Sequence, residues 1–170
     1  MASRTSLRQF QQDLAVRLSS AKAEPAPSAR LGVQCGEAHW LIDLTEAGEI
    51  MPVPAIAPVP LTRPWYAGLA NARGVLVSVV DFSAFVTGKP TPRTAENRLV
   101  LVNARLGINS ALLVSRMLGL RNPRDFNPVQ AEPAAQPWEG ELWTDQAGMR
   151  WRELSVARLV ALPEFLRIGI

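Results

Sequence analysis

The chain has 170 residues, of which 48% are hydrophobic and 19% charged, a balance that is typical of a globular protein and excludes a disordered chain. Its net charge of +3 comes from 18 basic and 15 acidic residues spread along the sequence, without the clustered basic footprint of a nucleic-acid-binding protein. One cysteine and one histidine exclude an internal disulfide and a metal site built from several Cys and His ligands.

The first 29 residues differ in pattern from the rest. Leu7, Phe10, Leu14 and Leu18 recur at spacings of three and four, which predicts an amphipathic helix, and a Pro/Ala-rich linker follows over residues 23–29. This helix either packs on its own domain or docks on another protein. No continuous apolar run marks a signal peptide or a membrane span, so we expect a cytoplasmic protein.

Period-two alternation begins at Leu31 and predicts a β-hairpin over residues 31–44 with its turn at Gly36-Glu37. Residues 49–51 predict a third short strand, and the prolines between positions 52 and 64 exclude a central strand there. Residues 65–70 favour a short helical turn. The strand over residues 75–81 is apolar enough to be buried on both faces.

The remaining pattern consists of short elements. It predicts a helical turn over residues 81–86 that ends at Gly88, apolar strands over 99–102, 111–114 and 142–143, a polar hairpin around 145–148, and a helical segment from residue 156. Many short strands with few helices predict an all-β barrel or sandwich, with residues 30–170 as the main domain.

Reactive chemistry is not evident in the sequence. There is no glycine-rich phosphate loop, metal-ligand cluster or nucleophile elbow, so we expect neither an enzyme nor a cofactor. His39 has no positioned partner and Cys35 is expected to be a small core residue. Two alternatives stay open: a small-ligand or enzymatic domain on a similar barrel, and a subunit whose N-terminal helix drives self-association.

The most informative stretch is Asn71-Ala72-Arg73-Gly74, which places an arginine between a polar turn and an apolar strand. Gly74 gives the backbone freedom at that junction, and the Arg73 guanidinium keeps its charge. Arg73 is either a partner contact or a clamp within its own domain. Glu49 is either a solvated strand end or a functional residue, and Ile50 is expected to be exposed.

The ordered pattern over residues 30–162 resembles the CheW family, the coupling proteins of bacterial chemosensory arrays. Residues 36–44 correspond to the family's acidic turn and Ile-Asp-Ile-type strand, 47–50 to its Val-x-Glu-Ile element, and 68–74 to its Gly-x-x-Asn-Leu-Arg-Gly signature. The N-terminal extension and the tryptophans of the C-terminal half make the chain more similar to the PilI-type branch, which serves twitching motility and the type IV pilus.

The resemblance implies two small five-stranded SH3-like β-barrels that share an intertwined core, and an adaptor without catalytic activity. It implies two partners, the CheW-like regulatory domain of a CheA-type histidine kinase and the cytoplasmic helical-hairpin tip of a methyl-accepting chemoreceptor, with recruitment to membrane-anchored receptor arrays. The positions expected at partner surfaces are Ala47, Glu49, Ile50, Gly68, Asn71, Arg73 and Leu99. Alanine instead of the usual valine at position 47 weakens the apolar contact expected there.

Overall fold

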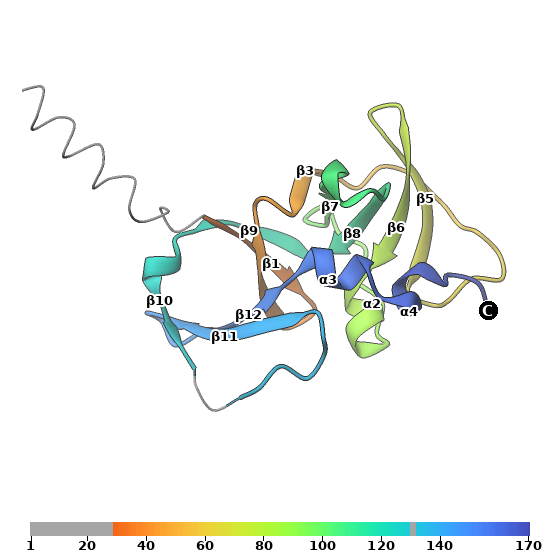
Figure 1. The fold of residues 1–170 in the computed structure, drawn as a ribbon. Helices are drawn as coiled ribbons and strands as arrows, with labels where there is room; N and C mark the ends of the chain where they lie inside the picture. Colours follow the sequence, from red (N-terminus) through yellow and green to blue (C-terminus); the bar gives the residue numbers. More distant parts are fainter. Residues whose placement is uncertain (1–28, 130–131) are drawn as a thin grey trace, which may run out of the picture.

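The computed structural model describes residues 29–129 and 132–170 (Figure 1). The chain forms two six-stranded sheets with short helices between and after the strands. Within the described residues, no helix is long and apolar enough to cross a membrane. The predicted N-terminal amphipathic helix and nearly all of the linker lie outside the described residues.

The first sheet has the strand order β10-β11-β12-β2-β1-β9. Its strands are β1 (Arg30–Cys35), β2 (Ala38–Asp43), β9 (Arg116–Arg121), β10 (Phe126–Pro128), β11 (Glu139–Asp145) and β12 (Arg150–Leu154). β1 and β2 form the predicted hairpin, with Gly36 at a φ of +59° in its turn. β12 pairs in parallel with β2, so strands from distant parts of the chain are neighbours at the centre of this sheet.

The second sheet has the strand order β3-β7-β8-β6-β5-β4. Its strands are β3 (Ala47–Pro52), β4 (Ile56–Ala57), β5 (Tyr66–Ala72), β6 (Val75–Asp81), β7 (Arg98–Val102) and β8 (Ser110–Val114). The prolines around β4 leave it as a two-residue edge strand, as the sequence predicts. β6 and β8 are parallel neighbours.

Short helices connect and close the sheets. They are α2 (Phe82–Thr87), α3 (Val156–Val160) and α4 (Pro163–Leu166), with 3-10 turns η1 (Ala104–Leu106) and η2 (Pro123–Asp125). Asp81 caps α2, because its buried carboxylate accepts a hydrogen bond from Ala84 N. The same carboxylate also accepts hydrogen bonds from the backbone N–H and the hydroxyl of Thr91. After β12 the chain returns to the second sheet, where Gly169 forms a bridge with Thr62. The expected intertwining of the two halves is therefore confirmed.

The largest apolar cluster joins the two sheets. An aromatic chain runs through it: Trp138 lies 5.4 Å from Trp40 and 5.5 Å from Phe82, measured between ring centroids, and Phe85 connects Trp138 to Phe165 of α4. Two smaller clusters fill the individual sheets, one around Val79, Leu99 and Leu113, the other around Leu41, Phe126 and Trp151. The two halves share one core, as the resemblance implies.

Two sequence predictions about the strands need correction. The helical turn over residues 65–70 is wrong, because β5 covers this segment and pairs with β6; its aromatic start favours a strand, and Gly68 at a φ of +129° is not helical. Each sheet has six strands instead of five, because the short edge strands β4 and β10 each add one.

Candidate protein-interaction site

The β5–β6 ribbon projects from the second sheet and ends in a two-residue turn (Figure 1). Arg73 and Gly74 form this turn with φ values of +51° and +88°, the positive pair of a type I′ turn. The side-chain Oδ1 of Asn71 accepts a hydrogen bond of 2.6 Å from Gly74 N. Arg73 therefore lies at the tip of the ribbon, held there by a side-chain hydrogen bond in the turn.

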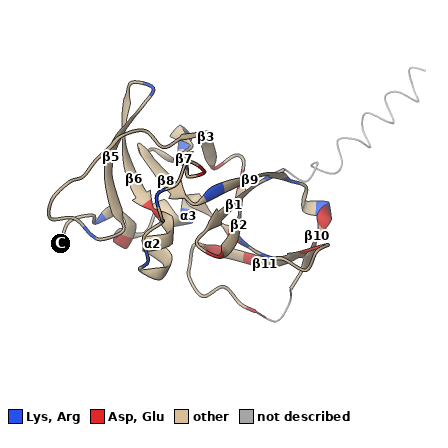
Figure 2. Cartoon of the chain, turned by 180° about the vertical axis from the view of Figure 1, so that it is seen from behind, with Lys and Arg blue, Asp and Glu red and all other residues tan. Residues whose placement is uncertain are grey.

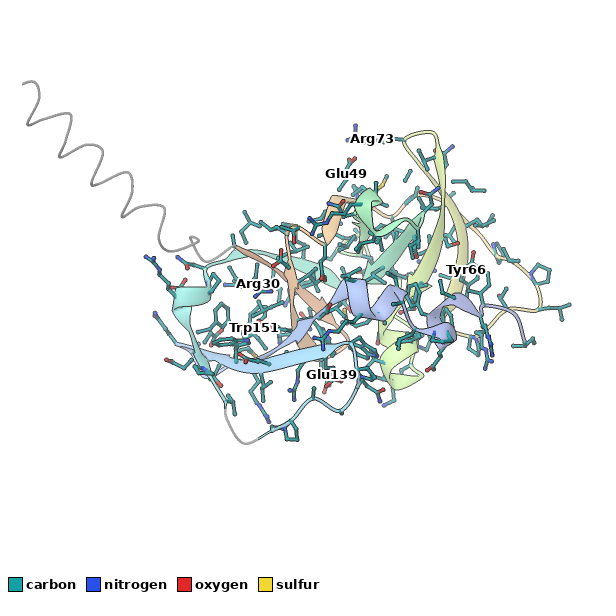
Figure 3. The ribbon with its side chains drawn as sticks, in the orientation of Figure 1. Arg30, Glu49, Tyr66, Arg73, Glu139 and Trp151 are labelled. Atoms are coloured by element: carbon teal, nitrogen blue, oxygen red, sulfur yellow. The ribbon has the colours of Figure 1, made fainter. Side chains whose placement is uncertain are left out.

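Arg73 forms an ion pair with Glu49 of β3 (Figure 3). Its Nε and Nη2 lie 2.7 and 2.6 Å from Glu49 Oε1. In the hydrogen-bonding order, β3 is at one edge of the second sheet and β5 is near the other, so this contact requires the sheet to curl toward a barrel. This ion pair is the contact expected if Arg73 holds two parts of its own domain together. The Arg73 side chain is nonetheless 77% exposed and open to a partner.

Two apolar side chains follow Arg73 on the ribbon. Val75 is 49% exposed and Leu76 61% exposed, whereas burial begins at Val77. The prediction that the strand over 75–81 is buried on both faces is therefore wrong for its first two residues, because they lie beyond the body of the sheet. We call Glu49, Asn71, Arg73, Val75 and Leu76 the ribbon-tip surface.

Four of the seven expected site residues are buried or half-buried. Leu99 is fully buried in the cluster of the second sheet, and Ala47 is 7% exposed. Ile50 is half-buried against the shared core and not exposed as the sequence predicts. Gly68 is buried, and a Cβ there would overlap the carbonyl oxygen of Ala57 on β4. These four residues contribute to the packing of the second sheet. Of the seven expected site residues, Glu49, Asn71 and Arg73 are the ones with exposed side chains.

A family model described as CheW-like domain matches residues 30–161. The chain belongs to the CheW-like domain family. It is 29% identical over 112 residues to Protein PilI of Pseudomonas aeruginosa, a match that covers 64% of this chain and 62%, about three fifths, of that relative. The crystal structure of the scaffolding protein CheW from Thermoanaerobacter tengcongensis matches 81% of this chain and 94% of its own, with a TM-score of 0.65 and 16% identity. The resemblance found in the sequence is confirmed.

Burial is the main cause of the shifted pKa values of Cys35 and His39. Burial raises the pKa of the Cys35 thiol, which lies 4% exposed in the shared core. His39 packs against Trp151 at 5.1 Å, and burial together with the nearby charge of Arg116 lowers its pKa. Within the described part of the chain, no group of three or more His, Cys, Asp or Glu side chains is placed to hold a metal ion.

Three surface pockets of the CheW-like domain lie away from the residues whose pKa values are shifted. Two of them flank the loop at Thr94 and Asn97, with volumes of about 560 and 360 Å³, and a third of about 760 Å³ borders Trp143 and Arg158. Cys35, His39 and Asp145 line none of the three. Figure 2 shows basic and acidic residues interspersed over the described part of both sheets.

The exposed pair Val75 and Leu76 is the feature that sequence reasoning missed. A turn of the form Asn-x-x-Gly between two apolar runs is a hairpin signal, and it would have placed both residues at a projecting tip. The helical assignment of residues 65–70 concealed it.

Proposed function

We propose that this chain is a non-enzymatic adaptor that couples chemoreceptors to a CheA-type histidine kinase in a bacterial chemosensory system. The match of a CheW-like domain model to residues 30–161 carries this proposal. The similarity to PilI favours the branch that controls twitching motility. Such an adaptor would act in the cytoplasm and be recruited to membrane-anchored receptor arrays.

The ribbon-tip surface has the chemistry of a reversible protein contact. It combines the guanidinium of Arg73, which can hydrogen-bond to a carboxylate through two N–H groups, with the exposed aliphatic side chains of Val75 and Leu76. Small interfaces of this kind give weak individual binding, and many copies in an array strengthen it through multivalency. We propose Glu49, Asn71 and Arg73 as direct contacts, with Ala47, Ile50, Gly68 and Leu99 supporting them from below.

Calorimetry against the two proposed partners tests this function. We expect the full chain to bind the regulatory domain of the cognate kinase, or the tip of the cognate receptor, with micromolar affinity. Leu76→Ser should weaken one of these interactions, whereas Leu120→Ser, at a residue 62% exposed on β9 of the other sheet, should not. Absence of binding to either partner at high micromolar concentration would contradict the proposal.

A deletion strain tests the assignment to a branch. Loss of twitching with normal flagellar swimming would support the PilI-type role, and the reverse would place the adaptor in a flagellar system. Complementation with the Leu120→Ser chain controls for expression.

A further inference from the structure

A row of side chains crosses the first sheet on the face that carries Trp151, which is labelled in Figure 3. Gln34 of β1 pairs with Arg116 of β9 on one side and with His39 of β2 on the other. His39 in turn pairs with Trp151 of β12. Residues directly opposite one another on neighbouring strands point to the same face of a sheet. Arg116 and His39 therefore lie in one row, and Arg116 Nε donates to Gln34 Oε1 between them at 2.9 Å.

Arg121 joins this row from the other end of β9. Its guanidinium carbon lies 4.9 Å from the centroid of the Trp151 ring, and the ring of His39 lies 5.1 Å from that of Trp151. Gly32 of β1 makes room for this arrangement, because a Cβ there would lie 3.0 Å from Trp151 Cζ3 and 3.2 Å from Arg121 Cγ. Burial, and then the charges of Arg116 and Arg121, lower the pKa of His39, as expected of groups that lie close together. We call His39, Arg116 and Arg121 the basic cluster.

The basic cluster offers more hydrogen-bond donors than acceptors. Among the residues that the structure describes, the buried Arg121 Nε has no hydrogen-bond partner, and neither arginine of the cluster has a carboxylate within 4.0 Å. Leaving a buried donor of a charged group unpaired is costly. Asp145 faces His39 and Arg121, but its carboxylate already accepts hydrogen bonds from Ala147 N, Met149 N and Trp151 Nε1. The cluster therefore presents positive charge and N–H groups to an acceptor from outside the chain.

The basic cluster can be reached from solvent. Arg116 is exposed, and His39 and Arg121 are half-buried. Arg116 also lines the surface pocket of about 360 Å³, which gives a small anion room beside it. The exposed carboxylate of Glu96 borders the same pocket, so an anion needs more than one basic group to hold it there.

We propose that the basic cluster binds a phosphate group, carried either by free phosphate or by a small phosphate monoester. Guanidinium groups bind phosphate oxygens through pairs of N–H groups, and several oxygens allow contact with several donors. One oxygen beside Arg121 would supply the missing acceptor, and others would meet Arg116 and the ring N–H of His39. Binding would fasten β9, an edge strand of the first sheet, to β2. The inference does not rest on the adaptor function, because the ribbon-tip surface belongs to the second sheet.

NMR spectroscopy of the full chain tests the site, with the indole N–H of Trp151 and the ring of His39 as reporters. Sodium phosphate should shift both resonances saturably, with a dissociation constant in the millimolar range or below, and sodium chloride at the same ionic strength should not. Arg121→Met keeps an aliphatic contact with Trp151 and removes the donors, so we expect at least about tenfold weaker binding. Arg116→Gln, at an exposed position, should weaken binding without disturbing that contact.

Arg105→Gln is the matched control, because it removes the same charge at an exposed position between β7 and β8 of the second sheet and should bind phosphate as the wild type does. Thermal unfolding without phosphate verifies that each variant is folded. Tighter binding of glycerol phosphate than of inorganic phosphate would favour a monoester as the ligand, and the reverse would favour free phosphate; either result supports the site.

Three results would overturn the phosphate site and leave the adaptor function untouched. The first is the absence of a saturable shift at tens of millimolar phosphate, or an equal shift with chloride. The second is phosphate binding that is unchanged in both Arg121→Met and Arg116→Gln. The third is tighter binding of succinate than of either phosphate compound, which would assign the cluster to carboxylates instead.

Discussion

The Arg73–Glu49 pair joins the ribbon tip to the opposite edge of its sheet, yet both side chains stay in contact with water. The Glu49 side chain is 38% exposed and that of Arg73 77%. An ion pair in this environment contributes little to folding, because the surrounding water screens the charges and two long side chains lose rotational freedom. The arginine is therefore free to exchange Glu49 for a carboxylate on a partner.

We accordingly predict that Arg73→Ala lowers the free energy of unfolding by no more than about 1 kcal/mol and weakens partner binding. Urea denaturation and calorimetry on the same preparation measure the two effects. Glu49→Ala should cost a similar amount, and the double variant should show a coupling of the same size. A loss of several kcal/mol would instead identify Arg73 as a structural clamp.

His39 and Asp145 give the chain two pH responses in different pH ranges. The pKa of His39 is lowered from 6.5, chiefly by burial and then by Arg116. The unfolded chain thus takes up a proton that the folded chain does not, and stability should fall as the pH drops below about 6.5 toward the folded pKa of His39. Thermal unfolding between neutral and mildly acidic pH measures this loss. His39→Gln should remove it.

Asp145 acts at lower pH. Burial raises the pKa of its carboxyl, but hydrogen bonds from Met149 N, Trp151 Nε1 and Ala147 N outweigh burial and the net pKa is lowered. The corresponding stabilisation is present above the unfolded value of 3.8 and is lost as the pH falls through the folded pKa. Asp145→Asn should flatten the acidic limb of the stability curve, and because the Asp145 carboxylate raises the pKa of His39, the same change should lower the pKa of His39 further.

At the scale of elements, Gly68 lies where β5 packs closely against β4. A Cβ at this position would overlap the Ala57 carbonyl oxygen, and the φ of +129° is itself unfavourable for other residues. We predict that Gly68→Ala lowers the free energy of unfolding by about 2–3 kcal/mol. Gly74→Ala is the control: it has a positive φ with nothing within 4 Å, so only backbone strain of about 1 kcal/mol should appear.

The aromatic chain through Trp138 holds β2, α2 and α4 together. Trp138 is 2% exposed, and Trp138→Ala should destabilise the fold by about 3–5 kcal/mol, since it opens a cavity between the two sheets. Trp143 is the comparison, because its indole N–H is buried without a hydrogen-bond partner among the described residues. Trp143→Phe removes that unpaired donor and should change stability by less than about 1 kcal/mol. Chemical denaturation of both variants measures the contrast.

The secondary-structure elements that turn and cap residues mark in the sequence were predicted correctly. Elements whose conformation depends on contacts between distant parts of the chain were missed. The β1–β2 hairpin and α2 were predictable, because Gly36, Asp81 and Gly88 mark turns and caps within a few residues. The β5 strand was assigned as a helical turn, because its strand conformation depends on pairing with β4 and β6 and the turn signal that follows it was not used. For the site, motif spacing identified Arg73 and Glu49, but the burial of Leu99 follows from packing that no local pattern records.

At the scale of the whole molecule, the turn after β2 is tied to the C-terminal helices. Glu46 accepts hydrogen bonds from Val156 N at 2.6 Å and from Ala157 N at 3.3 Å, which caps the start of α3. Arg30 bridges Asp43 and Glu153, joining β1 to β2 and β12. We therefore expect residues 30–170 to unfold as one cooperative unit, because these contacts join the two sheets.

We predict that a chain of residues 30–170 unfolds in one transition within about 2 °C of the full chain. A chain that ends at residue 155 should show no cooperative transition, because it lacks α3, α4 and part of the shared core. Calorimetry with light scattering measures both properties. Loss of a dimer on removing residues 1–29 would support the alternative in which the N-terminal helix drives self-association.

The parallel pairing of β2 with β12 also has a consequence for folding during translation. β2 ends at Asp43 and β12 begins at Arg150, so β2 waits for its neighbour until more than a hundred further residues have been translated. Throughout that interval one edge of the β1–β2 hairpin is open to strand pairing with other chains. Because long-range strand pairing of this kind closes slowly, we expect aggregation to compete with folding mainly while the chain is being synthesised.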